Sequence, residues 1–361
     1  MTDRTFLLLV VCMSLCLFSG EASASENIRV AIADNQKTVT LASSSGLMVE
    51  GISSGGREKK LTYHAGSLGA RPVRIRAAGD FIRVNGKSYR GWVELRREKN
   101  GQLLVINELA IEDYLKGVIA AEIPPDWEFE ALKAQAVASR TYALYQKHMR
   151  ENRPYHIRST VSSQVYNGGA GEQRQALQAV AATKGLVVVY QGEVIPAFYH
   201  SSCGGHTENA AELWDIDAPY LKGVDCECQA ISKYGSWEKR VELPKVVTAL
   251  RRRYGVNDIA DMTIESLTPA GRVKRVSIRS VRRTTLVPGE ALRAALGNTV
   301  VLSSFFELGL SDGQAVFSGR GRGHGVGLCQ WGAKEMAERG HDFRSILSHY
   351  YPGTSLARME P

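Results

Sequence analysis

The chain has 361 residues, of which 44% are hydrophobic and 23% are charged, and its net charge is +8. These proportions are ordinary for a globular protein with a sizeable buried core, and they argue against intrinsic disorder. The length exceeds that of most single domains, yet no low-complexity spacer separates two folding units. We therefore expect one large domain with an attached subdomain.

The amino terminus has the features of a secretory signal peptide. An apolar run from Phe6 to Phe18 follows Arg4, and small residues end at Ala24. The run is shorter than the roughly 20 apolar residues that span a bilayer, which favours cleavage of residues 1–24 over a retained anchor. We expect an exported protein of the periplasm or extracytoplasmic cell wall, membrane-associated only if the signal is kept.

The mature chain is predicted to be more basic than the precursor. Loss of residues 1–24 removes one cation and two carboxylates, so the net charge rises from +8 to +9. A basic exported protein suits an anionic wall polymer or membrane surface, whereas nucleic acid is a poor partner outside the cytoplasm. Solubility alone is the alternative explanation of this charge.

Residues 25–106 are predicted to form a β-rich amino-terminal subdomain. Short apolar runs, such as 28–32 and 103–106, are broken by turns that contain glycine. Asn85-Gly86 and Asn100-Gly101 each supply the residue pair that a tight hairpin turn requires.

Residues 107–361 are predicted to form a mixed α/β core with a glycine-rich carboxy-terminal segment, which makes the fold class α+β. The clearest helix is expected over 126–148, with Asp126 as its N-cap. Near the carboxyl end, helices are expected to begin at Gln330 and Asp342. The other expected elements are a helix at 173–182, a strand at 186–190, a helix at 243–254, a hairpin at 262–282 and a helix at 291–296.

Glu122 is the first candidate for a catalytic residue. It lies between an apolar segment, expected to be a strand or turn, and the stiff sequence Ile123-Pro124-Pro125. Desolvation would favour the protonated carboxyl that a general acid requires, whereas a nearby cation would oppose this pKa shift. From these residues alone, capping or ion pairing is the commoner role of a single glutamate near a helix start.

Lys133 and Arg140 lie on the helix that follows. Seven positions separate them, which is nearly two helical turns, so both project from one face. We expect a cationic stripe that faces whatever covers this helix. The alternative is a solvated face without a function.

A glycine-rich segment occupies the region before the last two helices. Glycine stands at every second position from Gly319 to Gly327, with Arg320, Arg322 and His324 between. Such a segment lets the backbone approach a ligand closely and supplies exposed amides. Its spacing fits neither template of the phosphate-binding loops, which argues against a nucleotide site. The alternative is a packed strand whose bulky neighbours need room.

Four cysteines remain after removal of the signal: Cys203, Cys226, Cys228 and Cys329. In an oxidising compartment, a disulfide among the first three is the leading expectation. A zinc site formed by the same three thiolates and one histidine is the second, because these ligands suit Zn²⁺. Free thiols are the third.

Five segments carry a family resemblance: 107–118, 121–124, 130–142, 164–166 and 319–353. Together they resemble the stage II sporulation protein D and amidase-enhancer family of bacterial wall proteins. The resemblance implies a lytic transglycosylase-like activity on peptidoglycan glycan strands, with Glu122 as the single acid/base and a 1,6-anhydro sugar as product. It requires no second catalytic carboxylate, unlike most glycosidases.

The resemblance also implies supporting roles. Lys133 and Arg140 match family positions tied to activity, and His324 and Gln330 are candidates for substrate binding or catalytic support. Family members often carry histidine and cysteine zinc ligands just before 164–166, where this chain has Ser162 and Ser163. No zinc is therefore implied at that place, and no cofactor is required.

Two other functions compete with the enzyme. The chain could be a non-catalytic wall-binding protein that enhances an N-acetylmuramoyl-L-alanine amidase, or a purely structural component of a wall complex. The family name also implies a role in sporulation. Substitution of Glu122 distinguishes the enzyme from the wall-binding enhancer, because only the enzyme needs the Glu122 carboxyl group to form product.

Overall fold

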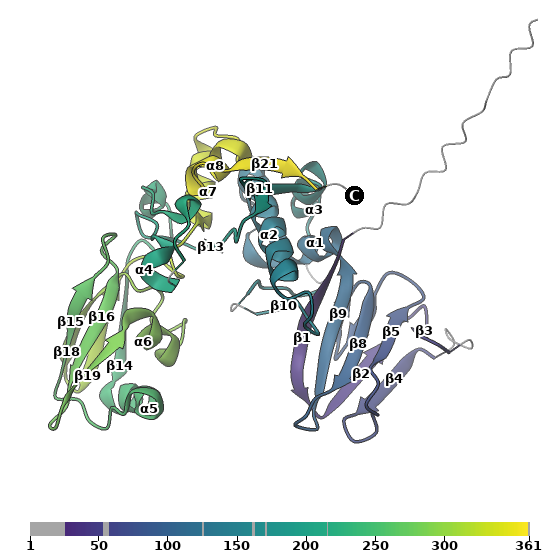
Figure 1. Ribbon diagram of the computed structural model, residues 1–361, viewed down its shortest axis with the longest axis horizontal. Coiled ribbons are helices and arrows are strands. Elements are labelled where there is room, and N and C mark those ends of the chain that lie inside the picture. Colours follow the sequence, from purple (N-terminus) through teal and green to yellow (C-terminus); the bar gives the residue numbers. More distant parts are fainter. Residues whose placement is uncertain are drawn as a thin grey trace, which may run out of the picture.

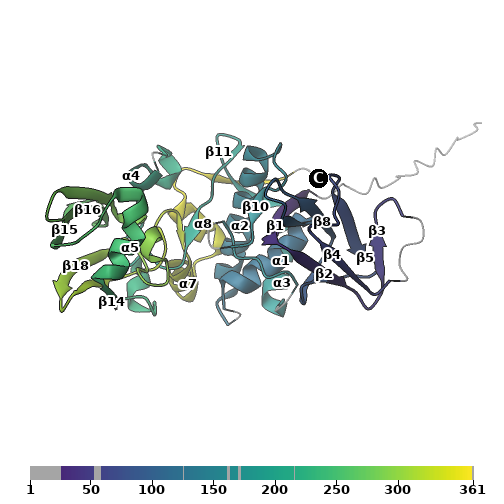
Figure 2. The same ribbon diagram turned by 90° about the horizontal axis from the view of Figure 1, so that it is seen from below.

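The computed structural model describes residues 26–52, 58–124, 126–160, 163–169, 172–214 and 216–359. The predicted signal peptide, Pro125 and Ser162 lie outside these residues. No helix in the described ranges is both long and apolar enough to cross a membrane. Three parts follow one another along the longest axis of the molecule (Figures 1 and 2). Helices and mostly antiparallel sheets occur together, which confirms the α+β class.

The amino-terminal part contains two sheets that share one hydrophobic cluster. Their strand orders are β10-β1-β9-β8-β5-β3 and β4-β2-β6-β7. Both Asn-Gly turns are confirmed, the first between β6 and β7 and the second between β8 and β9. The strands are β1 (Asn27–Gln36), β2 (Thr38–Ala42), β3 (Leu47–Val49), β4 (Lys60–His64), β5 (Val73–Ala77), β6 (Ile82–Val84), β7 (Lys87–Tyr89), β8 (Trp92–Arg97), β9 (Leu103–Ala110) and β10 (Ile157–Arg158).

Glu122 ends a helix, α1 (Ile111–Glu122), where a strand or turn was expected. The helix forms because its buried residues recur three or four positions apart and cover one face. Pro124 excludes the helical conformation at the residue before it, and Ile123 is extended with φ −128° and ψ 135°. The helix therefore stops at Glu122 and leaves its side chain at the helix end.

The central helix α2 (Phe129–Met149) joins the amino-terminal part to the middle of the molecule. Leu132 and Ala136 belong to the cluster of the amino-terminal sheets, whereas Ala134 and Val137 belong to a second cluster. The helix begins three residues after the predicted Asp126. The reason is that Trp127 is buried in the connection, where its ring lies 5.1 Å from that of Trp331.

The second cluster lies in the middle part, between α2 and the last helices. The helix at 173–182 and the strand at 186–190 are confirmed, as are the last two helices. The elements of this part are α3 (Arg174–Ala182), β11 (Leu186–Tyr190), β12 (Glu193–Val194), β13 (Tyr199–His200), α4 (Ala210–Trp214), η1 (Pro219–Leu221), η2 (Glu227–Ala230), β20 (Leu328–Cys329), α7 (Gln330–Glu338), α8 (Phe343–Tyr350) and β21 (Ser355–Arg358).

A third part with its own hydrophobic cluster lies at the far end from the amino-terminal sheets (Figure 1). It contains two three-stranded antiparallel sheets and two helices, and the predicted hairpin and both helices are confirmed. The elements are β14 (Trp237–Glu242), α5 (Leu243–Tyr254), β15 (Asp261–Leu267), β16 (Val273–Arg279), β17 (Thr284–Pro288), α6 (Gly289–Leu296), β18 (Phe306–Ser311) and β19 (Gln314–Gly319).

The glycine-rich segment forms a loop between β19 and β20, where a packed strand was the alternative expectation. Four of its glycines have positive φ, which prevents a regular strand. A Cβ atom at Gly323 would lie 2.8 Å from the Cβ of His200, and one at Gly327 would collide with the carbonyl oxygen of Phe198. The lack of side chains at these glycines thus lets the segment that contains β13 pack closely against the loop. In this arrangement β13 pairs in parallel with β20.

Candidate active site

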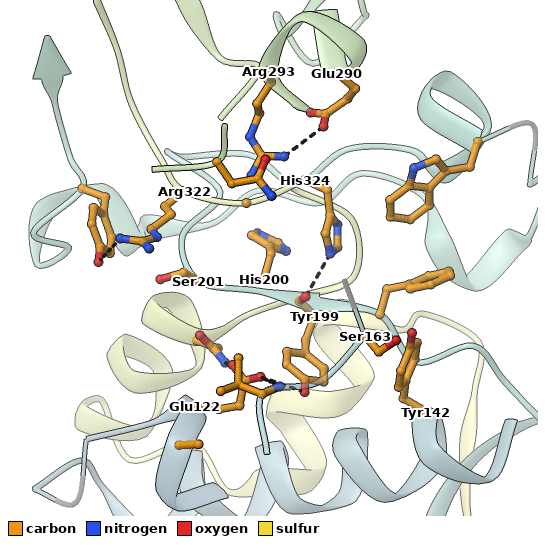
Figure 3. Close-up of a pocket in the computed structure, with 18 residues that line it drawn as sticks. Glu122, Tyr142, Ser163, Tyr199, His200, Ser201, Glu290, Arg293, Arg322 and His324 are labelled. Carbon is orange, nitrogen blue, oxygen red and sulfur yellow. Dashed lines mark hydrogen bonds and ion pairs between the residues drawn. The ribbon is translucent and has the colours of Figure 1, made fainter. Parts of the chain in front are cut away.

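Glu122 lies in a cavity of about 570 Å³ between the middle and third parts of the molecule (Figure 3). This volume is in the range of small-molecule sites. One wall carries Glu122 at the end of α1, and another carries Glu290 and Arg293 from α6. The β13 segment and the glycine-rich loop supply His200 and His324. Chain segments far apart in the sequence thus build one site.

Three donors hold the Glu122 carboxyl group. Its Oε1 accepts a hydrogen bond from the backbone N–H of Val165 at 2.9 Å and lies 3.4 Å from the hydroxyl of Tyr199. Its Oε2 lies 3.4 Å from Nε2 of Gln330, the first residue of α7. Oε1 thus accepts the shortest of these hydrogen bonds, whereas Oε2 has a single, longer contact.

The pKa of Glu122 is raised above its ordinary value of 4.5. Burial is the main cause, and it outweighs the opposing hydrogen bonds from Val165, Gln330 and Tyr199. The sequence left open whether desolvation or a nearby cation would dominate, and desolvation does. A carboxyl group with this shift keeps its proton to higher pH, as a general acid must.

His324 faces the cavity with a fixed, neutral ring. Its Nδ1 accepts the backbone N–H of Val326 at 3.1 Å, so the other nitrogen, Nε2, carries the proton and donates to the carbonyl oxygen of Tyr199 at 3.0 Å. Burial lowers the pKa of His324 to about 3. Both nitrogens are engaged and the ring is uncharged at neutral pH, so His324 shapes the cavity and positions the β13 segment.

His200 lies beside His324, with the ring centroids 5.4 Å apart. Its Nδ1 lies 3.1 Å from the carbonyl oxygen of Val326, and its Nε2 has no hydrogen-bond partner among the described residues. Burial holds the pKa of His200 well below its ordinary value. The two histidines therefore add no positive charge to the cavity at neutral pH.

The remaining walls combine aromatic rings with two arginines. The rings of Phe198 and Trp214 lie 4.8 Å apart, and Trp214 is 37% exposed. Arg293 pairs with Glu290 at 3.0 Å. Arg322 donates to the hydroxyl of Tyr234 at 2.9 Å and forms no ion pair within the part of the chain that the structure describes. Arg322 is thus the cation of the cavity that remains available to an anionic ligand.

Lys133 and Arg140 do not line this cavity. Arg140 is fully buried, and its guanidinium forms a bidentate pair with Glu112 of α1, at 2.8 Å for both bonds. It also donates to the carbonyl oxygen of Leu186 at 3.1 Å. Lys133 pairs with Glu130 and lies over the ring of Phe343, with 16% of its side chain exposed. The two cations thus face the elements that cover the helix, and each has an acidic partner, so they do not form a stripe that faces the cavity.

The four cysteines gather at a second place, behind the β13 segment. Cys203, Cys226, Cys228 and Cys329 are buried free thiols, and their Sγ atoms all lie within 4.8 Å of one another. The sequence grouped the first three and expected a histidine as a fourth ligand. Cys329 takes that place, because the parallel pairing of β13 with β20 brings it beside Cys203.

The place where the resemblance locates a family zinc site does not fit a metal ion in this chain. Ser163 is described and lines the cavity, and its only side-chain donor atom is a neutral hydroxyl. Zinc sites in proteins use thiolate, imidazole and carboxylate ligands. We therefore derive no catalytic step through a metal at this position.

The fold and site define an α+β protein with a buried carboxyl group of raised pKa, that of Glu122, in an aromatic-walled cavity. The profile of a family described as "Stage II sporulation protein" matches residues 99–190, which contain Glu122. A second profile, "Domain of unknown function (DUF8618)", matches residues 211–327, which comprise most of the third part and the glycine-rich loop.

Known proteins from several bacteria are similar to this chain. An uncharacterised protein of Brachyspira hyodysenteriae is 36% identical over 279 residues, 77% of this chain and 74% of that protein. The amidase enhancer of Bacillus subtilis is 32% identical over 67% of this chain, which covers 40% of that longer protein. Stage II sporulation protein D of Bacillus amyloliquefaciens is 29% identical over 71% of this chain and 76% of its own length. The chain belongs to the stage II sporulation protein D and amidase-enhancer family.

Of the residues predicted for the site, Glu122, His324 and Gln330 come together in the cavity. Sequence reasoning missed the hydrogen bonds that Tyr199 and Val165 make to Glu122. Tyr199 stands four residues before Cys203, in a segment that was considered only for its cysteines, as a disulfide, a zinc site or free thiols. The pairing of β13 with β20, across almost 130 residues, was the missing information.

Proposed function

We propose that this protein cleaves peptidoglycan glycan strands as a lytic transglycosylase, with Glu122 as its single acid/base. Membership of the family suggests a cell-wall-related role. The observation that carries the proposal is the Glu122 carboxyl group, which burial keeps protonated above its ordinary pKa at the wall of a sugar-sized cavity. A general acid that acts near neutral pH needs this shift.

In the first step, Oε2 of Glu122 donates its proton to the bridging glycosidic oxygen. The bond from C1 of the muramic acid to that oxygen breaks, and the leaving sugar departs with a free 4-hydroxyl group. The positive charge that develops on the sugar ring faces the newly formed carboxylate. Val165 and Tyr199 donate to its Oε1, which stabilises this anion while it lasts.

In the second step, the 6-hydroxyl oxygen of the same muramic acid forms the new bond to C1. The Glu122 carboxylate takes the proton of that hydroxyl and returns to its starting state. The products are a 1,6-anhydro end and a free 4-hydroxyl end, and no water is consumed. One carboxyl group suffices, because the nucleophile belongs to the substrate, in contrast to the carboxylate pairs of most glycosidases.

The cavity walls support a glycan as substrate. The faces of Phe198 and Trp214 offer apolar surface of the kind that packs against sugar rings. Arg322 offers a guanidinium without an acidic partner among the described residues, and a carboxylate is its natural ligand. Muramic acid bears a free lactyl carboxylate only where the stem peptide has been removed. We therefore propose a preference for peptide-free strands, with Arg322 as the carboxylate anchor.

The test compares the purified mature protein with its Glu122→Gln variant on peptide-free and on intact peptidoglycan. Soluble products are analysed by mass spectrometry for anhydro ends. Anhydro products from the unaltered protein alone support the proposal. Glu193→Gln, which removes an exposed carboxylate on β12, is the matched control and should behave like the unaltered protein.

The second candidate function is a wall-binding enhancer of a cell-wall amidase. It is favoured by the 32% identity to a protein named amidase enhancer. An enhancer keeps wall affinity and partner stimulation after Glu122→Gln and releases no anhydro sugar by itself. Intact wall binding without any product from either protein would replace the first proposal by this one.

We further propose that the protein is exported and acts at the cell wall. The signal-peptide pattern before Ala24 and the basic mature chain support this location. The mass of the protein recovered from the producing cells tests it, because cleavage removes residues 1–24. A full-length chain in the cytoplasmic fraction would contradict it.

A further inference from the structure

Three chain segments converge on the four buried thiols. Cys203 follows β13, Cys226 and Cys228 flank the start of η2, and Cys329 ends β20. Their Sγ atoms all lie within 4.8 Å of one another, and those of Cys203 and Cys228 are 3.4 Å apart. Each sulfur is thus close to the other three. Two separate disulfides would require only that each sulfur lie close to one partner.

We propose that these four cysteines bind one zinc ion as a tetrahedral tetrathiolate site. Zn–S bonds of about 2.3 Å place the sulfurs of such a site about 3.8 Å apart, in the range of separations observed here. Four protein ligands leave no open position, so the ion is structural. The site differs from the one that the family resemblance locates near Ser163, and it does not depend on the proposed reaction.

Hydrogen-bond donors lie next to three of the four sulfurs. The backbone N–H groups of Cys203 and Gly332 point to Sγ of Cys329, at 3.3 and 3.4 Å. The hydroxyl of Tyr350 lies 3.2 Å from Sγ of Cys226, and that of Ser202 lies 3.6 Å from Sγ of Cys228. Donors of this kind orient and stabilise metal-bound sulfur.

A buried cation lies beside the cluster. Arg272 is fully buried, and its Nη2 donates to the carbonyl oxygen of Cys203 at 2.6 Å. Zn²⁺ with four thiolates carries a net charge of −2, and a buried anion of this kind needs a nearby positive charge. The carboxylate of Glu208 also lies near this guanidinium, at 4.0 Å from Nε of Arg272. The arginine therefore links the cluster to the third part of the molecule.

The zinc site would hold two segments of the cavity in place. Cys329 directly precedes Gln330, whose Nε2 lies 3.4 Å from Oε2 of Glu122. Cys203 follows β13, which carries Tyr199 and His200. The metal thus acts as a positioning element for the cavity and takes no part in proton transfer.

The full mature chain, produced with zinc in the medium, is analysed by native mass spectrometry and by metal quantification. We expect one zinc ion per chain, and four thiols that react with a thiol reagent only after denaturation with a chelator. Replacement of zinc by Co²⁺ should give the near-ultraviolet thiolate-to-metal absorption of a tetrathiolate site. These measurements use the unaltered protein, so they remain decisive if a cysteine variant fails to fold.

A pair of variants sharpens the test. Cys226→Ser should weaken zinc binding by more than the roughly 10- to 100-fold that loss of an outer-shell partner costs, or abolish it, because it removes a ligand. Ser232→Ala, which removes a buried hydroxyl after η2 that accepts the backbone N–H of Tyr234, should keep one zinc ion. A metal-free chain whose mass is lower by two hydrogen atoms per disulfide would overturn the proposal. A metal-free chain with four reactive thiols would overturn it equally.

Discussion

Glu122 and Arg140 are both ionisable residues on the helices of the core, yet their surroundings differ. Arg140 is fully buried and bonded to Glu112 and to backbone carbonyl oxygens of other elements. Glu122 has no cationic partner within the described chain, and burial raises its pKa above the ordinary value. A charge that is fully paired stabilises the fold, whereas a group held in an unfavourable state is available for chemistry.

The largest effect is expected from loss of the Glu122 carboxyl group. Glu122→Gln should lower the rate of glycan cleavage by at least about 10²- to 10⁴-fold, because the amide cannot transfer a proton. The rate is followed by the release of soluble anhydro sugars. Glu290→Gln removes the other carboxylate among the described residues that line the cavity, and it should leave the rate within about tenfold. Equal losses in both variants would indicate a two-carboxylate mechanism and contradict our account.

A variant of Arg140 tests whether this residue supports the fold and takes no part in the chemistry. Arg140→Met should lower the free energy of unfolding by about 3–5 kcal/mol, because it removes the fully buried guanidinium of the pair and leaves the half-buried Glu112 without its cation. Denaturant unfolding measures this change. Lys133→Met, at a more exposed pair, should cost only about 0–1 kcal/mol. A stable Arg140→Met protein that has lost activity would assign Arg140 to the chemistry instead.

Substrate preference should depend on Arg322. Arg322→Gln removes the proposed carboxylate anchor, and we expect the preference for peptide-free over intact strands to fall by about 10-fold, since hydrogen bonds to charged groups contribute about 1.5–3 kcal/mol. Parallel digests of the two substrates give the ratio of rates. An unchanged ratio would show that Arg322 does not recognise the substrate carboxylate. The proposed role of Glu122 would not be affected by this result.

The smallest effect is a pH-dependent gain in stability. The raised pKa of Glu122 means that its carboxylate destabilises the fold above that pKa, whereas below the ordinary value of 4.5 the group is protonated in both folded and unfolded chains. Glu122→Gln should therefore raise Tm at about pH 7 and leave it unchanged at roughly pH 3.5. A lower Tm at neutral pH would show that the Glu122 carboxylate is stabilised by its donors.

Much of the fold could be predicted from local patterns. Both Asn-Gly hairpins, the basic helix α5, the hairpin of β15 and β16 and the two last helices follow from short-range signals of turns and caps. The helix α1 was missed because its apolar residues also fit a strand. Only the burial of one face distinguishes the two, and that face packs on segments distant in sequence.

The site could be predicted only in part. Glu122, His324 and Gln330 stand in recognisable motifs, but their meeting depends on the pairing of β13 with β20. No local signal shows that Cys329 joins the other three thiols. Lys133 and Arg140 show a further limit, because a motif marks a residue without saying whether its side chain lines the cavity, and these two do not line it.

The most direct test of the central claim follows the oxygen atoms. Peptide-free glycan is digested by the unaltered protein in water enriched in ¹⁸O, and the new muramic acid ends are analysed by mass spectrometry. Our account predicts anhydro ends without ¹⁸O, because the 6-hydroxyl of the substrate supplies the new bond, and no such ends from Glu122→Gln. Reducing ends that carry ¹⁸O would show hydrolysis and contradict it.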